Sequence, residues 1–273
     1  MQLFSSWTGG DFLLFYTMLL GLCTVAAWWI PAHLREPGRS GESSDPETLA
    51  MLAGGRERLA DSLLVDLFVR GGLAAADDGK LIVAQPGVPA TPAGKELLAL
   101  DAPITLAEAR KRIGVHAERL AARLRRNGLM LRPEELARLR WLSIAPFGAL
   151  LMLGLYRQRA GAALGEPTGF LVALLALTVV LAVFRFMKTD PRTIAGIAAV
   201  AQARKRSARL ARAPQAEEAA MAVALFGTAV LVGTPWEPVH AMRQQGSSSD
   251  SGSSSGDSDS GSGCGGGCGG CGG

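Results

Sequence analysis

Three long apolar stretches constrain this chain more than any other feature of its sequence. The first, from Phe12 to Ile30, contains no Asp, Glu, Lys or Arg. As an α-helix it would be about 28 Å long, which matches the hydrocarbon thickness of a bilayer. The sequence therefore predicts a membrane-spanning helix at residues 12–30, within an N-terminal segment of residues 1–31.

A cleaved signal peptide is the alternative interpretation of this first stretch. No Lys or Arg precedes Asp11, and Trp28-Trp29-Ile30-Pro31 lacks the small residues of a cleavage site. A tryptophan pair is typical of the membrane interface, and Arg35 and Arg39 follow it. By the positive-inside rule we expect the amino terminus outside and residue 31 onward in the cytoplasm.

Two further apolar stretches, Trp141–Tyr156 and Gly169–Met187, predict a membrane hairpin over residues 141–187 with an external loop at 157–168. The first is short, about 24 Å as a helix, and contains Pro146. In the second only Arg185 is charged, close enough to the end to reach the interface. Basic residues flank the hairpin on its cytoplasmic side: Arg138, Arg140, Lys188, Arg192, Arg204, Lys205, Arg206, Arg209 and Arg212.

Between the first two spans, residues 32–140 are long enough for a soluble domain. Asp45-Pro46-Glu47 predicts the start of a helix that Gly54-Gly55 ends, and a second helix follows from Arg56 to Arg70. Short apolar runs at 73–76 and 81–84, separated by Asp77-Asp78-Gly79, predict a β-hairpin. The expected fold is therefore a mainly α membrane protein with a cytoplasmic winged-helix-like α+β domain.

This domain has the pattern of two related units, at residues 45–95 and 104–135. Each contains a helix, a glycine stop and an apolar strand, while convergent helix-stop chemistry is the alternative. The alignment pairs Leu64, Val65, Phe68, Gly72 and Leu73 with Leu120, Ala121, Leu124, Gly128 and Leu129.

After the third span we expect a basic, Ala-rich cytoplasmic helical region at residues 188–243. Within it, Ala219–Gly233 is apolar but only about 23 Å long as a helix, which favours a buried or interfacial helix over a fourth span. Residues 244–273 consist mostly of Ser, Gly and Asp, a composition that predicts a disordered tail.

Four sequence segments together resemble a family of uncharacterised bacterial membrane proteins, defined by a domain next to a low-complexity, Gly/Cys-rich carboxyl terminus. A bacterial source also fits the heavy use of Ala, Arg and Gly. The resemblance implies a membrane protein and supplies no catalytic residues. The segments are Leu49-Ala50-Met51-Leu52-Ala53-Gly54-Gly55, Gly165-Glu166-Pro167-Thr168-Gly169-Phe170-Leu171, Val223-Ala224-Leu225-Phe226-Gly227, and the closing Cys264-to-Gly273 repeat.

The closing repeat places Cys264, Cys268 and Cys271 close together in the tail. Three thiolates on a flexible backbone are a candidate site for a soft metal such as Zn or Cu(I), with His240 as the nearest fourth ligand. Lipid attachment, reversible disulfide exchange and an inert variable tail are the alternatives. No resident cofactor is expected.

A basic cluster lies ahead of the second span. Its arginines at positions 119, 123, 125 and 126 are candidates for contact with lipid headgroups or nucleic acid, and a solvated helix face is the alternative. The net charge of +4 favours no nucleic-acid partner by itself. The cluster consists of Arg110, Lys111, Arg112, Arg119, Arg123, Arg125 and Arg126.

The chain carries no recognisable catalytic constellation. His33, His116 and His240 are isolated in sequence, and no Gly-rich phosphate loop follows a predicted strand. The hypothesis is therefore a non-enzymatic protein-interaction or scaffold module at the inner leaflet of a bacterial cell membrane, with the bilayer and an unidentified protein as partners. A membrane-tethered DNA-binding regulator and a thiol- or metal-handling protein are the alternatives.

Overall fold

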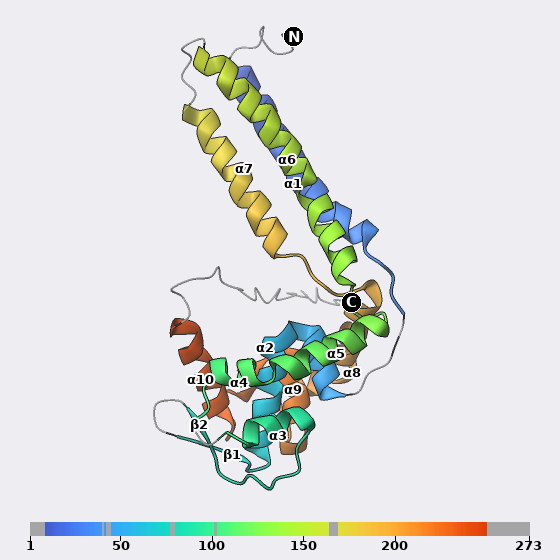
Figure 1. The fold of residues 1–273 in the computed structure, drawn as a ribbon, viewed down its shortest axis with the longest axis vertical. Coiled ribbons are helices and arrows are strands. Elements are labelled where there is room, and N and C mark those ends of the chain that lie inside the picture. The colour runs from blue at the N-terminus through green and yellow to red at the C-terminus, as the bar shows by residue number, and fades with distance from the viewer. Residues whose placement is uncertain are drawn as a thin grey trace, which may run out of the picture.

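The computed structural model describes residues 9–39, 41, 45–76, 80–100, 103–163 and 169–249. Over these residues the chain forms a bundle of three long helices and, beneath it, a domain of shorter elements (Figure 1). The bundle contains α1 (Gly9–Leu34), α6 (Pro133–Ala163) and α7 (Gly169–Met187). The chain therefore passes between the two parts three times.

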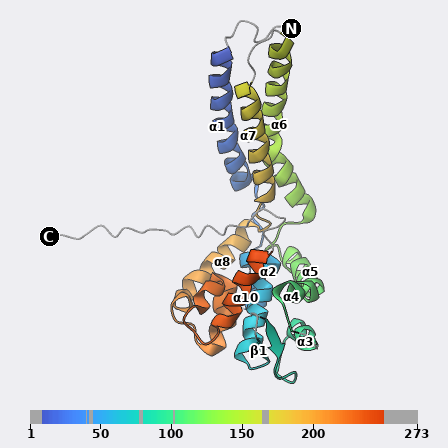
Figure 2. The same ribbon diagram turned by 90° about the vertical axis from the view of Figure 1, so that its left-hand side faces the viewer.

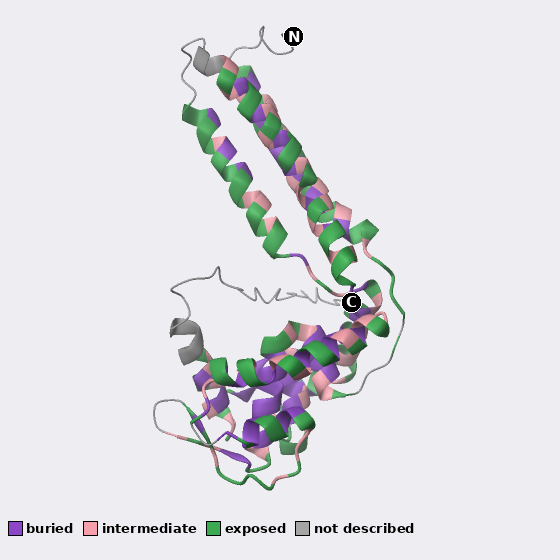
Figure 3. Ribbon diagram, viewed as in Figure 1, coloured by how far each residue is buried: buried purple, intermediate pink, exposed green. Residues whose placement is uncertain are grey.

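Each bundle helix is long and apolar enough to cross a membrane. Large apolar side chains such as Leu14, Met18 and Val180 are exposed on the outside of the bundle. Figure 3 shows exposed residues, in green, along all three bundle helices. An apolar surface of this size is not stable in water and indicates a lipid environment. The three predicted spans are thus confirmed as candidate membrane helices, and the fold indicates a membrane protein.

One stripe of α1 forms the inside of the bundle, with residues spaced three or four apart as in a packed helix face. Tyr16 lies at its centre, and its hydroxyl is 3.1 Å from Oγ1 of Thr178 on α7. A side chain at Gly154 of α6 would collide with Tyr16 and Leu175, so the close approach requires glycine. The stripe consists of Phe12, Tyr16, Leu20, Cys23 and Ala27.

Helix α6 is longer than the apolar stretch that predicted it. It begins at Pro133, with Glu134 and Glu135 in its first turn, and continues through Pro146. Proline is favoured at the first helical position, and acidic residues there interact well with the helix dipole. The apolar pattern predicted only the segment of α6 that lipid would surround.

The domain is built around α2 (Pro46–Val69), which starts at the N-cap Asp45, whose carboxylate accepts the Thr48 N–H at 3.1 Å. Non-helical backbone at Gly54 and Gly55 divides α2 into two segments, and φ is 67° at Gly55. Glycine adopts this left-handed conformation without a steric penalty. The predicted break between two helices is therefore confirmed at these residues.

A two-stranded antiparallel sheet follows, formed by β1 (Leu73–Ala75) and β2 (Leu81–Val83), with Leu73 opposite Val83. The predicted hairpin is confirmed, and its expected turn at 77–79 lies outside the described residues. A single bridge between Leu81 and Ile104 extends the sheet. Three helices come next, namely α3 (Pro92–Leu98), α4 (Leu106–Arg112) and α5 (Gly114–Arg126).

The remainder of the chain returns to the same domain. Its helix α9 is buried against α2, with Val223 and Leu225 fully inaccessible. Figure 2 shows α2 between α3 to α5 on one side and α8 and α10 on the other. The elements are α8 (Ile194–Arg206), η2 (Ala208–Ala211), η3 (Ala216–Glu218), α9 (Ala219–Phe226), η4 (Thr228–Leu231) and α10 (Glu237–Ser249).

This shared core differs from the sequence-based division of the chain, which treated residues 188–243 as a region apart from the 32–140 domain. The buried core draws side chains from both, including Leu64 and Val223. Among the described elements, Ala219–Phe226 is a buried core helix and is not one of the three candidate spans.

Two finer expectations differ from the structure. The described residues contain one two-stranded sheet, and a winged-helix domain is not shown. The hairpin comes before α3, α4 and α5 in the chain. In addition, α9 packs on a face of α2 that a domain made of residues 32–140 alone would leave exposed. Helix α10 runs to Ser249, into the segment that was expected to be disordered, and residues 250–273 lie outside the described part of the chain.

The predicted pair of related units can be compared at their helix ends. Gly71 and Gly128 both have positive φ, 75° and 74°, and each follows a helix that ends at the preceding turn. The N–H of Gly72 bonds to Leu67, as the N–H of Leu129 does to Leu124. The common feature is a C-cap, one residue out of the register that the sequence alignment gave.

Candidate functional site

Helix α5 carries the basic residues that the sequence singled out. Its inner face packs on α2 through Leu120, Ala121 and Leu124, and its basic residues are therefore left at the surface. Residues 119, 123 and 126 are exposed on one face, since they are spaced four and three apart. Arg125 is half-buried on a different side of the helix.

Helix α5 ends near the start of α6, at the foot of the bundle (Figure 1). The residues there line a cleft. It has a volume of about 550 Å³. We name it the junction cleft. Its charged lining residues are Arg39, Arg125, Arg126, Arg132, Glu36 and Glu135. The structure thus brings Arg125 and Arg126 to this cleft and leaves Arg119 and Arg123 on the outer face of α5.

Main-chain hydrogen bonds hold the three chain crossings together beside this cleft. The segment after α1 accepts bonds from the start of α8, with Ala195 N–H donating to Pro37 at 2.9 Å. The segment before α6 joins the same layer, since Leu131 N–H donates to Pro191 at 2.8 Å. Oγ1 of Thr193 donates to the Gly128 carbonyl at 2.8 Å. Each crossing is therefore fixed to another.

An ionic group reinforces the junction. The Asp190 carboxylate pairs with Arg192 at 2.7 Å and with Arg35 at 3.6 Å. Burial by itself would raise the pKa of Asp190, but the hydrogen bonds and charge of Arg192, with the charge of Arg35, outweigh it and hold that pKa below its usual value. Arg192 also donates to the Leu52 carbonyl, next to the break in α2.

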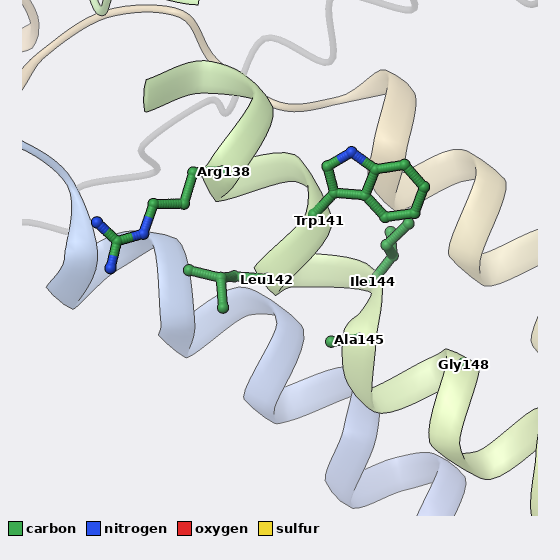
Figure 4. A pocket seen from close by; sticks show the side chains of 6 residues that line it. All are labelled: Arg138, Trp141, Leu142, Ile144, Ala145 and Gly148. Carbon is green, nitrogen blue, oxygen red and sulfur yellow. The ribbon is translucent and has the colours of Figure 1, made fainter. Parts of the chain in front are cut away.

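A second concavity lies on the membrane helix α6 and is almost wholly apolar (Figure 4). Trp141 and Ile144 lean to one side of α6, and Arg138 and Leu142 lean to the other. An indole and a guanidinium one turn apart are typical of the interface between lipid and water. This groove fits the lipid-facing surface of a span.

The candidate metal ligands Cys264, Cys268 and Cys271 lie outside the described residues. His240, the expected fourth ligand, is engaged through both ring nitrogens, by Thr228 at 3.0 Å and by Gln244 at 3.0 Å. Among the described residues, no three His, Cys, Asp or Glu side chains lie together in a way that could hold a metal ion.

Sequence reasoning missed a buried ionic group between α2 and the C-terminal elements. Asp61 is 1% exposed and pairs with Arg243 of α10. Arg58 is also buried, donates to the Val223 carbonyl at 3.4 Å and lies against Gly227, where a side chain would collide with it. The sequence carried one indication of this group: Arg58 and Asp61 lie beside the apolar face of the predicted helix at residues 56–70.

Comparisons with family models, with curated proteins and with solved structures find no match. The resemblance to the Gly/Cys-rich family therefore stays a prediction. The fold itself defines the class, a mostly helical protein with three candidate membrane spans and a helical domain fixed to their foot.

Proposed function

We propose that this is an integral protein of a bacterial inner membrane, with its amino terminus outside and its domain and tail in the cytoplasm. The domain would serve as a non-enzymatic interaction or scaffold module at the inner leaflet. The observation that carries this proposal is the hydrogen-bonded junction, in which all three chain crossings are fixed to one another.

This junction supports a scaffold because it sets the orientation of the domain relative to the bundle. The foot of α5 stays next to the spans, while α3 and the β1–β2 hairpin lie at the far end of the domain in both views (Figures 1 and 2). A partner would then meet the same distal surface each time. A fixed presentation of this kind lowers the entropic cost of binding.

The distribution of basic residues supports the proposed sidedness. Arg35, Arg138 and Lys188 lie at the domain end of the three bundle helices. At the opposite end, Arg157 is 7% exposed and its guanidinium lies 5.7 Å from the centre of the Phe12 ring. Arg159 is exposed at this opposite end, but more exposed basic residues, among them Arg39, Arg138 and Lys188, lie at the domain end, the side that would face the cytoplasm.

The scaffold proposal can be tested by placing a photo-cross-linking residue in the full-length protein in cells. Val115 on α5 is 60% exposed and Ile82 on β2 is 41% exposed, and either position should give a discrete protein adduct. The matched control is Val180 on α7, which is 62% exposed and should contact lipid alone. Absence of a protein adduct from both domain positions would contradict the proposal.

The exposed arginines of α5 keep DNA binding as a second candidate function. Duplex binding through Arg119 and Arg123 should fall steeply with salt, because phosphate contacts release counterions. The test uses full-length protein in uncharged nanodiscs and its R119E/R123E variant. Tight duplex binding that the variant loses would favour the regulator over the scaffold.

A further inference from the structure

We propose that the junction cleft binds the phosphate of an anionic phospholipid headgroup from the adjacent leaflet. This deepens the proposed function and rests on it, because the domain must be held at the membrane for a lipid to reach the cleft. Four arginines line the cleft, none of them has a side-chain ion pair within the part of the chain that the structure describes, and the spans place them near the headgroups.

The four arginines come from three separate parts of the chain. Arg39 follows α1, Arg125 and Arg126 end α5, and Arg132 precedes α6. With Glu36 and Glu135 also in the lining, the formal charge of the cleft is four minus two, or +2. The planar guanidinium presents paired N–H donors that match phosphate oxygens.

These arginines differ from others in the domain. Arg56 pairs with Glu118, Arg110 with Glu57 at 3.3 Å, and Arg209 with Glu218 at 2.6 Å. By contrast, none of the four arginines of the cleft forms a side-chain ion pair with any residue that the structure describes. Glu135 instead accepts the main-chain N–H of Arg132 at 2.8 Å.

The walls of the cleft are held in place before any ligand arrives. Gly38 and Gly128 both have positive φ, 71° and 74°. A side chain on Gly38 would collide with the Gly128 carbonyl and with Thr193. The loop that carries Arg39 therefore lies directly against the loop that follows Arg126, so binding would require little ordering of the main chain.

The spans bring the cleft to the level of lipid headgroups. Arg132 directly precedes α6, and the interfacial residue Trp141 lies nine positions further along the chain. This separation corresponds to about 14 Å along the helix axis. The headgroup region extends beyond the hydrocarbon core on each side and covers part of this distance. An extended arginine side chain covers a further part of it. A lipid phosphate can therefore approach the cleft from the leaflet, whereas a nucleic-acid duplex would meet the bilayer.

The experiment measures lipid binding to full-length protein in detergent by native mass spectrometry, with phosphatidic acid, phosphatidylglycerol and phosphatidylcholine as probes. We expect retention of the two anionic lipids over phosphatidylcholine. The cleft variant R39Q/R125Q/R132Q should lose at least tenfold in affinity for them. The matched control R112Q/R119Q/R123Q removes the same charge from exposed positions and should stay within twofold of the native protein.

Equal losses in the two variants would overturn the site, because they would show diffuse attraction to the basic surface. Displacement of the lipid by inorganic phosphate at similar concentration would overturn the lipid as the source. Displacement by duplex DNA with loss in the cleft variant alone would assign the cleft to nucleic acid instead. An unchanged thermal midpoint of the cleft variant confirms that it is folded.

The same variants separate this proposal from the scaffold function. If the cleft variant binds lipid normally while Val115 and Ile82 give no protein adduct, the lipid site and the scaffold both fail. If lipid retention behaves as expected and the adducts are absent, the scaffold alone fails. If the adducts form and lipid retention does not depend on the cleft, the lipid site alone fails.

Discussion

In the bundle, Leu14, Met18 and Val180 expose their side chains, whereas in the domain Leu64, Leu97 and Val223 are fully buried. The polar groups are also distributed differently. In the domain, the buried carboxylate of Asp61 pairs with the partly exposed Arg243, while the bundle interior is mostly apolar. The bundle therefore depends on lipid for its stability, and the domain depends on contacts between distant parts of its own chain.

The sharpest test of this comparison asks on which side of the membrane the domain and tail lie. In a C23A background, a membrane-impermeant maleimide applied to intact cells after mild reduction should leave the tail cysteines unlabelled, because the proposed topology of three spans with an external amino terminus would put them inside. Labelling should appear on lysis. Strong labelling before lysis would contradict the proposed topology.

The next largest effect is expected in the domain core. L64A should lower the free energy of unfolding of the domain by about 2–5 kcal/mol, since it leaves a cavity between α2 and its neighbours. M18A, at an outward position that is 81% exposed, should change stability by less than about 0.5 kcal/mol. Urea denaturation of each variant in nanodiscs, monitored by proteolysis of the domain, measures the two changes in stability. Equal effects of L64A and M18A would contradict the difference between domain and bundle.

Buried charge should matter more than surface charge on the same helix. D61N weakens the pair with Arg243 in a site with 1% exposure and should cost about 1–3 kcal/mol. D66N affects an exposed pair with Arg70 at 2.9 Å and should cost about 0.5 kcal/mol or less. Hydrogen exchange in α10 should rise in the first variant and not in the second.

The junction is expected to tolerate side chains at Gly38 poorly. In G38A an alanine must adopt the left-handed conformation of Gly38, which should lower stability by about 1–2 kcal/mol. The collision of its Cβ with Gly128 and Thr193 adds to this cost. G148A on α6, where a Cβ meets open space, is the control. Faster protease cleavage around residues 36–41 in G38A, with no change in the control, is the expected outcome.

The smallest effect concerns pH. The pKa of Asp190 is lowered in the folded protein, so the stabilisation it supplies is present above about pH 4, its unfolded value, and is lost as pH falls through the lower folded value. Hydrogen exchange at the start of α8 should therefore increase below about pH 4. D190N should remove this component of the pH dependence, and an unchanged profile would contradict the assignment.

The features that the sequence predicted are those that local chemistry determines. A bilayer requires continuous apolar helices, so the three spans could be located directly. The break at Gly54 and Gly55 and the strands around 73 and 81 also follow from glycine and short apolar runs. The sequence also located the basic cluster, but it grouped Arg125 with residues 119, 123 and 126, whereas helical periodicity places Arg125 on a different side of α5.

The rest depends on contacts between distant residues. Helix α2 is buried on nearly all sides because α9, far along the chain, covers it, and this also explains why Asp61 and Arg58 are buried. The junction cleft needs the segments around Arg39 and Arg132 to meet the end of α5. No pattern within one segment of the sequence indicates that meeting.

The three fixed crossings also have a mechanical consequence. Helices adjust their tilt when the bilayer becomes thinner or thicker than their apolar length. Because Pro37, Leu131 and Thr193 are hydrogen-bonded into one layer, a change in tilt of α1 or α6 must either rotate the domain as a rigid body or break those bonds. A change in bilayer thickness would therefore act on the orientation of the domain through this junction.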